Sequence, residues 1–244
     1  MNLCIDQGNT RTKIAVFQDD GKILFAKVYN FFTKKDVEQL FVQYPEMDVI
    51  VSSVAVVEFS VIEALLRMSR FMVVFNSRTP VPVVNAYDSP ETLGSDRLAA
   101  AVGANYLYPN ENLLVVDAGS AITYDFVNEH NTYCGGNIAP GISMRLVSLH
   151  EYTNKLPLVT VDKDRTLPFF GKNTRDAIAA GVMQGVVFEL QGYRHILQEK
   201  HKLGRTVLTG GDAPYLAEYL SEKVICEESL VLIGLNRILE YNKP

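Results

Sequence analysis

The stretch Leu3-Cys4-Ile5-Asp6-Gln7-Gly8-Asn9-Thr10-Arg11-Thr12-Lys13-Ile14-Ala15-Val16-Phe17 consists of an apolar run, a polar turn and a second apolar run. This pattern predicts two strands joined by a tight turn. Gly8 lets the backbone turn without a side-chain clash, and the N–H groups of such a turn can face an anion. Because Asp6 ends the first strand, the turn combines a carboxylate with amides and hydroxyls. That combination suits a metal-bound polyphosphate.

The same pattern returns past the middle of the chain. Leu113 to Val116 leads into Asp117, followed by Gly119 and Ser120, and Thr123 stands six residues after the aspartate, as Thr12 does in the first copy. Each copy alone is equally an ordinary hairpin, because Asp-x-Gly is a common turn signal. Two copies in which the same residue types stand at the same spacing after the aspartate favour two related domains that face each other across a cleft.

Length and element order agree with a duplication. A chain of 244 residues can form two domains of roughly 100–150 residues each. Strands followed by alternating helices and strands indicate an α/β fold. We therefore predict an N-terminal domain over residues 1–108 and a C-terminal domain over 109–244, with a proline-containing loop at 76–92. Helices are expected near 33–44, 58–69 and 175–200, and another is opened by the stretch 93–97 and reaches about 106.

Composition narrows the class of protein. The formal net charge is −5 and charged residues make up 21% of the chain, so no basic patch for nucleic acid is indicated. Cys4, Cys134 and Cys226 are too dispersed for a disulfide framework or a zinc site. The sequence shows neither a signal peptide nor an apolar run of ~18 residues. We expect a cytoplasmic protein with neither nucleic acid nor membrane as a partner.

The chemistry is expected to rest on carboxylates, because no P-loop or dinucleotide motif is present. Asp6 and Asp117 stand at strand ends and could hold a hydrated magnesium ion. Asp96 opens an alanine-rich helix, where it could cap the helix or accept a hydroxyl proton; Arg97 and the preceding Gly94-Ser95 favour the second role. Thr209-Gly210-Gly211 either forms a plain glycine turn before a helix or contributes to a pocket for a nucleotide base or ribose.

Five motifs together resemble the type III pantothenate kinase family, a branch of the acetate and sugar kinase, Hsp70 and actin superfamily. They are Asp6 to Lys13, Leu93-Gly94-Ser95-Asp96-Arg97, Asp117-Ala118-Gly119-Ser120-Ala121, Gly171-Lys172-Asn173-Thr174 and Thr209-Gly210-Gly211. The resemblance implies two duplicated actin-like (ribonuclease H-like) domains. It also implies ATP-dependent phosphorylation of pantothenate to 4′-phosphopantothenate, the first step of coenzyme A biosynthesis.

The resemblance further implies roles for particular residues. Asp96 would be the general base, Asp117 would help to bind a monovalent cation, K⁺ or NH₄⁺, and Asp6 would lie near Mg²⁺. The family is dimeric, so a homodimer is expected, with Thr174 reaching pantothenate from the neighbouring subunit. Ser120 replaces the more usual threonine and keeps its hydroxyl. The ATP-binding set is Asp6, Gln7, Gly8, Asn9, Thr10, Arg11, Thr12, Lys13 and Ser120, and the pantothenate-binding set is Tyr87, Gly94, Ser95, Asp96, Arg97 and Thr174.

Two other functions remain open on the sequence. One is a kinase for another small alcohol such as a sugar, against which the Gly94-Ser95-Asp96-Arg97 stretch argues. The other is a catalytically silent nucleotide-binding regulator of the same fold. The presence of all three aspartates favours an enzyme. For Tyr87, packing within the domain is an alternative to ligand binding.

Overall fold

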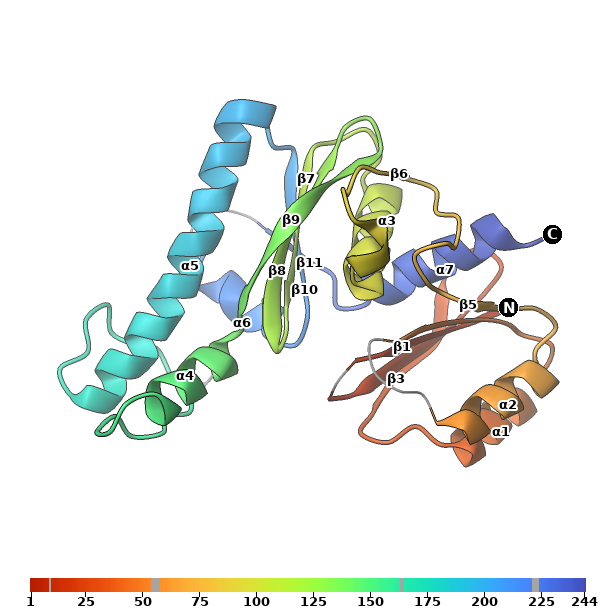
Figure 1. Cartoon of the computed structure of the whole chain (residues 1–244), viewed down its shortest axis with the longest axis horizontal. Coiled ribbons are helices and arrows are strands. Elements are labelled where there is room, and N and C mark those ends of the chain that lie inside the picture. The colour runs from red at the N-terminus through yellow and green to blue at the C-terminus, as the bar shows by residue number, and fades with distance from the viewer. Residues whose placement is uncertain (9, 54–57, 163–164, 221–223) are drawn as a thin grey trace. The chain divides into compact units, whose positions relative to one another are not determined.

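The computed structural model describes residues 1–8, 10–53, 58–162, 165–220 and 224–244, and it forms two compact units (Figure 1). Unit 1 comprises Met1–Asn110, His130–Cys134 and Ser229–Pro244, and unit 2 comprises Glu111–Glu129 and Gly135–Glu228. The first break falls two residues beyond the predicted boundary of 108. The C-terminal segment differs from the predicted division, because it returns to unit 1.

Unit 1 is built on a five-stranded mixed sheet with the order β3-β2-β1-β4-β5. The first three strands form an antiparallel meander, and β4 and β5 continue the sheet in parallel to β1. This is the outcome expected for three sequential strands followed by alternating helices and strands. The strands are β1 (Asn2–Gln7), β2 (Thr12–Phe17), β3 (Ile23–Tyr29), β4 (Asp48–Ser53) and β5 (Met72–Val74).

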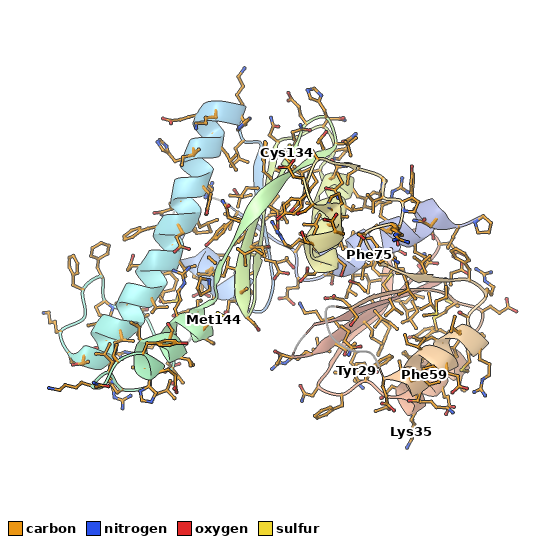
Figure 2. The ribbon with its side chains drawn as sticks, in the orientation of Figure 1. Tyr29, Lys35, Phe59, Phe75, Cys134 and Met144 are labelled. Atoms are coloured by element: carbon orange, nitrogen blue, oxygen red, sulfur yellow. The ribbon has the colours of Figure 1, made fainter. Side chains whose placement is uncertain are left out.

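Helices lie on both faces of this sheet. Figure 1 shows α1 (Lys34–Gln43) and α2 (Phe59–Met68) on one face and α3 (Ser95–Leu107) and α7 (Leu230–Asn242) on the other. Leu3 and Ile5 belong to the apolar core shared with α1 and α2, which is filled by side chains in Figure 2 while Lys35 points outward. Since side chains alternate along a strand, Asp6 lies on the opposite face, toward α3 and α7.

Two glycines allow α3 and α7 to cross in close contact. A Cβ atom at Gly103 would overlap the carbonyl of Leu230, and one at Gly234 would overlap the carbonyl of Ala99. The obstacle in both cases is backbone, which cannot swing aside as a side chain can. The crossing therefore depends on the absence of side chains at these two positions.

An ionic network around the buried Asp48 joins the C-terminal segment to the sheet. Asp48 on β4, which is 4% exposed, receives two hydrogen bonds from Arg70 of 3.0 and 2.7 Å and an ion pair of 3.0 Å from Lys243. Lys243 also pairs with Glu240 at 2.6 Å and donates to Asn2 at 2.7 Å. The network satisfies charges that would be costly if buried alone.

The network gives stability a defined pH dependence. Burial opposes ionisation of Asp48 and Glu240, but the cationic partners outweigh it and lower both pKa values, and the pKa of Lys243 is raised by the same contacts. Because the pKa values of the two carboxyl groups are lowered by folding, they stabilise the fold at pH values above the unfolded-state pKa of ~4. The raised pKa of Lys243 adds stability that is lost only above pH ~10.4. We expect the free energy of unfolding to fall as pH drops from about 5 to about 3.

Denaturant unfolding at several pH values measures this dependence. The control is Lys243→Met, which removes the shared cation and brings both carboxyl pKa values closer to their unfolded values. The acid-side slope of this variant should be shallower than that of the wild type. An unchanged slope would show that the network does not set the acid response.

Unit 2 repeats the strand order of unit 1. Five strands of the six-stranded second sheet run β9-β8-β7-β10-β11, with β7 and β8 antiparallel and with β10 parallel to both β7 and β11. The same order in two units confirms the predicted duplicated α/β fold. The bounds are β7 (Leu113–Ala118), β8 (Ala121–Asn128), β9 (Thr132–Pro140), β10 (Arg205–Thr209) and β11 (Ile225–Cys226).

The helices of unit 2 are α4 (Ile142–Glu151), α5 (Thr174–His201) and α6 (Ala213–Glu218). One side of α5 packs into an apolar core with β7 and β10. Met183 of α5 belongs to this core, as do Leu114 and Val116 of β7 and Leu208 of β10. Leu114 and Val116 are two positions apart, so they lie on the same face of the sheet. Among the helices of the described residues, none combines the length and hydropathy that a membrane span requires.

Two segments differ from the sequence-based expectation. The predicted loop at 76–92 contains the short strand β6 (Val84–Asn85), which pairs with the start of β9, and a 3-10 turn at Pro90–Thr92. Strand β9 continues through Gly135 and Gly136, where glycines would ordinarily mark a turn. Gly136 is required inside the strand because a Cβ there would overlap the backbone and side chain of Asp125.

Candidate active site

The first polar turn joins β1 to β2 in unit 1. Asp6 lies opposite Lys13 in the antiparallel register, Gln7 lies opposite Thr12, and the N–H of Gly8 donates to the carbonyl of Arg11 at 3.0 Å. Thr10 and Arg11 are exposed at the tip, whereas Thr12 is buried, and Asn9 lies outside the described residues. The turn thus has the predicted form, with a carboxylate at its base and a hydroxyl and a cation at its tip.

Strand β4 connects this turn to the start of α3. Ser52 is the parallel neighbour of Asp6, and its hydroxyl lies 2.8 Å from that of Ser95, the first residue of α3. Ser52 is fully buried, so this contact fixes the end of β4 against the helix. The structure therefore brings two predicted regions of unit 1 together, the Asp6 turn and the Gly94-Ser95-Asp96-Arg97 segment.

Asp96 lies half-buried in the first turn of α3. Its Oδ1 accepts a hydrogen bond of 2.8 Å from the N–H of Arg97, and the carboxylate lies so close to Gly94 that a Cβ there would overlap Oδ1. Asp96 does not cap the helix, because the N-cap of α3 is Gly94 and no side chain of the described residues caps it. The bond from the N–H of Arg97 fixes the orientation of the carboxylate, which a general base needs.

Arg97 is buried, and its guanidinium carbon lies 5.7 Å from the ring centroid of Tyr87, within cation–π range. Tyr87 is held by a hydrogen bond from its N–H to Asn85 at 3.1 Å and by a ring contact of 6.2 Å with Tyr133. Tyr87 therefore both packs within its unit and lies near the proposed substrate residues. The fully buried Tyr133 was missed by sequence reasoning, because nothing in the pattern around it sets it apart from other strand aromatics.

In unit 2, Asp117 lies near the end of β7, opposite Thr123 on β8 and Thr209 on β10. Gly210 follows β10 with a φ of 90°, and a Cβ there would overlap Asp117 Oδ1 and the backbone of Ala118. The glycine turn after β10 is therefore packed directly against the carboxylate. This contact explains why a glycine stands at that position.

The second polar turn resembles the first in its backbone bonding. The N–H of Gly119 donates to the carbonyl of Ala121 at 3.0 Å, and the N–H of Gly141 donates to the carbonyl of Ser120 at 3.1 Å. Ser120 is exposed, and α4 begins directly after Gly141. The hydroxyl of Ser120 is thus presented at the same end of the unit 2 sheet as Asp117.

Among the described residues, no three His, Cys, Asp or Glu side chains are placed to hold a metal ion together. A magnesium ion that is bound through nucleotide phosphates and water needs only one or two carboxylates from the protein. Asp6 fits such a role, because it is half-exposed at the base of a turn. Asp117 Oδ1 and the backbone carbonyl of Ala118 both lie beside Gly210, so two oxygen atoms of the type that a monovalent cation prefers are close together there.

Thr174 is the first residue of α5 and belongs to unit 2, whereas the other predicted pantothenate residues belong to unit 1. It lines a hollow of about 790 Å³ together with Arg145 and Lys172. The preceding Asn173 caps α5 by accepting a 2.9 Å bond from the N–H of Asp176. Thr174 thus lies at a rigid helix start beside two cations.

Sequence reasoning also missed an ion pair beside this hollow. Arg145 of α4 makes two bonds of 2.7 Å to Glu189 of α5, and the hydroxyl of Tyr124 donates to Glu189 at 3.3 Å. Burial, with Glu189 nearby, raises the pKa of Tyr124. The sequence did carry one sign of this pair, a glutamate within an otherwise apolar stretch of α5. The pair joins α4 to α5.

Both units have the same strand order, and in each unit an aspartate lies near the end of the first strand. These two features define a protein of the actin-like class. Solved structures of similar fold include a ROK hexokinase from Thermus thermophilus, with a TM-score of 0.51, 14% identity and 99% of each chain covered. Another is a Baf family transcriptional activator from Campylobacter jejuni, with a TM-score of 0.63, 24% identity and 98% of each chain covered. These likenesses confirm the predicted fold.

A model of the type III pantothenate kinase family matches residues 2–195. A type III pantothenate kinase of Phocaeicola vulgatus is 40% identical over 242 residues, covering 99% of both chains. One from Bacteroides fragilis is 41% identical over 243 residues, covering 99% of this chain and 98% of the relative. The chain belongs to the type III pantothenate kinase family.

Proposed function

We propose that this chain transfers a phosphoryl group from ATP to the hydroxyl of pantothenate in the cytoplasm, which gives 4′-phosphopantothenate and begins coenzyme A biosynthesis. The single observation that carries this function is the full-length similarity to type III pantothenate kinases at about 40% identity. Neither a kinase for another alcohol nor a silent regulator is favoured by these relatives. The proposed roles of individual residues rest on the geometry of each unit.

Asp96 is the general base in this proposal. Its carboxylate is oriented by the N–H of Arg97 and occupies the space beside Gly94 that a side chain at that position would fill. A carboxylate that accepts the hydroxyl proton as the phosphoryl group transfers makes the oxygen a better nucleophile. Gly94, Ser95 and Arg97 flank Asp96 along the chain, and the Tyr87 ring lies within cation–π range of Arg97. These four residues are the proposed pantothenate contacts.

The Asp6 turn is the proposed site for the ATP phosphates. The exposed Thr10 and Arg11 offer a hydroxyl and a cation, and Lys13 stands opposite Asp6 on the neighbouring strand. Magnesium held near Asp6 would neutralise charge on the transferring group. The role of the chain's own residues is to position the phosphates in line with the pantothenate hydroxyl.

Unit 2 contributes the remaining proposed contacts. Asp117 binds K⁺ or NH₄⁺, supported by the close packing of the glycine turn on its carboxylate, and the exposed Ser120 hydroxyl contacts ATP. Thr174 contacts pantothenate bound to the partner subunit of a homodimer. The position of Thr174 at a capped helix start in a hollow of about 790 Å³ supports a ligand-binding role.

A kinase assay with a single monovalent cation tests this function. We expect purified protein with ATP and magnesium to phosphorylate pantothenate, and turnover with K⁺ to exceed that with Na⁺ by about tenfold, a difference of ~1.4 kcal/mol in the barrier. Asp117→Asn should remove the preference for K⁺. A folded, ATP-binding protein that phosphorylates other alcohols but not pantothenate would contradict the proposed substrate.

A further inference from the structure

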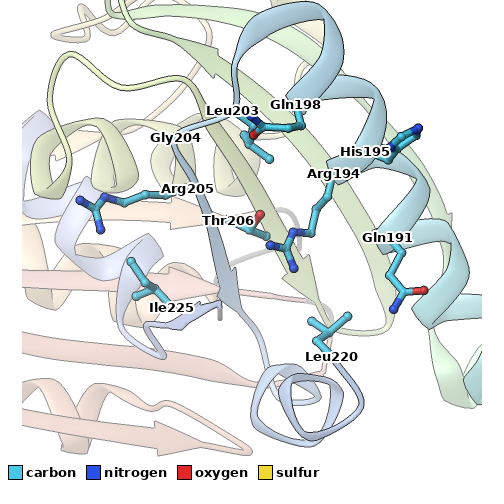
Figure 3. Close-up of a pocket in the computed structure, with 10 residues that line it drawn as sticks. All are labelled: Gln191, Arg194, His195, Gln198, Leu203, Gly204, Arg205, Thr206, Leu220 and Ile225. Atoms are coloured by element: carbon cyan, nitrogen blue, oxygen red, sulfur yellow. The ribbon is translucent and has the colours of Figure 1, made fainter. Parts of the chain in front are cut away.

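A second hollow in unit 2, of about 620 Å³, lies between α5 and the start of β10 (Figure 3). Its lining includes Gln191, Arg194, Gln198, Leu203, Thr206 and Leu220. The proposed ATP contact of unit 2, Ser120, lies instead just after β7, at the end of the sheet where Asp117 pairs with Thr209 of β10. Thr206 and Thr209 are three residues apart along the strand, a distance on the order of 10 Å. The hollow is therefore distinct from the proposed ATP contacts of this unit, and its volume is within the range of ligand sites.

The polar lining on α5 is periodic. Gln191, Arg194 and Gln198 are three and four residues apart, so they lie on one face of the helix. Figure 3 shows Arg194 extending from α5 toward Thr206 on β10. Guanidinium and amide N–H groups are hydrogen-bond donors that suit an oxyanion, and Arg can bind phosphate or carboxylate through two parallel bonds.

The charge of the lining is one-sided. Among the described residues that line the hollow are two arginines and a histidine but no aspartate or glutamate, in a protein whose net charge is −5. Within the described ranges, Glu111 pairs with Arg205 at 2.7 Å and Glu199 lies 3.3 Å from His195, both at the margin of the hollow. In Figure 3, Arg205 and His195 point away from Thr206. The cation directed toward the strand is Arg194.

Thr206 supplies an independent observation. Its side chain is 4% exposed, and within the described part of the chain its Oγ1 has no hydrogen-bond partner. It lies two positions before Leu208, on the face of β10 that packs toward α5, where valine would fill the same space without a hydroxyl. A buried hydroxyl without a partner is destabilising, so its presence points to a partner supplied from outside the chain.

We propose that this hollow binds a small molecule through an anionic group, a phosphate or a carboxylate. The guanidinium group of Arg194 binds the anion, and the glutamine amides of α5 add hydrogen-bond donors. When Arg194 moves to bind the ligand, the Thr206 hydroxyl gains a hydrogen-bond partner. Leu203 and Leu220 provide apolar wall for the rest of the molecule. The site is distinct from the proposed contacts of unit 2 with ATP and the monovalent cation, and it does not depend on which alcohol the enzyme phosphorylates.

Methyl NMR of the full-length protein tests this site. Threonine and leucine methyl groups are labelled, the Thr206 signal is assigned by its loss in Thr206→Val, and orthophosphate or acetate is added at constant ionic strength against sodium chloride. We expect a saturable shift of the Thr206 methyl signal with at least one of the two anions. Arg194→Met should weaken the apparent affinity by about tenfold or more, as expected for a lost charge-assisted pair. Lys200→Met, which removes a cation from the exposed side of the same helix, should not.

The two anions distinguish the ligand class. Saturation with phosphate alone assigns a phosphate-bearing ligand, and saturation with acetate alone assigns a carboxylate. In Thr206→Val, the Leu220 methyl signal should report weaker binding of the same anion. Shifts that do not saturate, that chloride reproduces, or that persist unchanged in Arg194→Met would overturn the site. Phosphate bound only at the proposed ATP site would produce the last of these results.

Discussion

Replacing Asp96 with asparagine is expected to lower turnover by about 10²–10⁴-fold and to leave ATP binding intact. The amide cannot accept the hydroxyl proton, so the step that needs a base is slowed. Its side-chain oxygen can still accept the 2.8 Å bond that Oδ1 receives from the N–H of Arg97, so the start of α3 should be preserved. The loss should therefore appear in turnover and not in folding.

The measurement combines steady-state kinetics with calorimetric titration of ATP. Asp20→Asn is the matched control, because Asp20 is an exposed turn residue in unit 1 whose carboxylate pairs with Lys22. The control should keep the turnover of the wild type. Turnover close to normal in Asp96→Asn would rule out Asp96 as the general base, whatever its effect on substrate affinity.

Replacing Gly234 with alanine is expected to reduce the free energy of unfolding by about 1–3 kcal/mol, as overpacking does in a tightly packed site. The added methyl would overlap the carbonyl of Ala99, so α3 and α7 must separate. Separation weakens the packing of both helices on the sheet. Because α3 begins at Ser95 and Asp96, it should also disturb the proposed active site.

Gly192→Ala is the control for this substitution. Gly192 lies within α5, and a Cβ there would meet nothing within 4 Å. Alanine favours a helix over glycine by ~1 kcal/mol, so this variant should gain stability while Gly234→Ala loses it. Chemical denaturation of both variants gives the comparison. Equal changes in the two would show that helix propensity, and not the crossing, determines the effect.

Most of the fold could be predicted from local sequence. The apolar runs and the Asp-x-Gly turns placed the first two strands of each unit, and the helix predicted near 33–44 is observed as Lys34–Gln43. The return of α7 to unit 1 could not be predicted, because it depends on long-range contacts such as that between Asn2 and Asn236. The strand conformation of Gly136 likewise depends on contact with a neighbouring strand.

The candidate site was predictable in its residue types and less so in its connections. The aspartates stood out because they end strands or open a helix. The buried link between Ser52 and Ser95 was not visible, since a serine at a strand end carries no distinctive signal. Arg145 and Glu189 were missed for a related reason, because charges that are 44 residues apart reveal their pairing only in the folded unit.

The C-terminal helix also affects the order in which the chain can fold during synthesis. Unit 1 begins at Met1 but includes Ser229–Pro244, and Lys243 contacts Asp48 and Asn2. The ribosome releases these last residues only after all of unit 2 has been made, at ~5–20 residues per second. Until then the face of β1 and β4 that α7 will cover stays without its partner helix. The half of the protein that is translated first is therefore the half that is completed last.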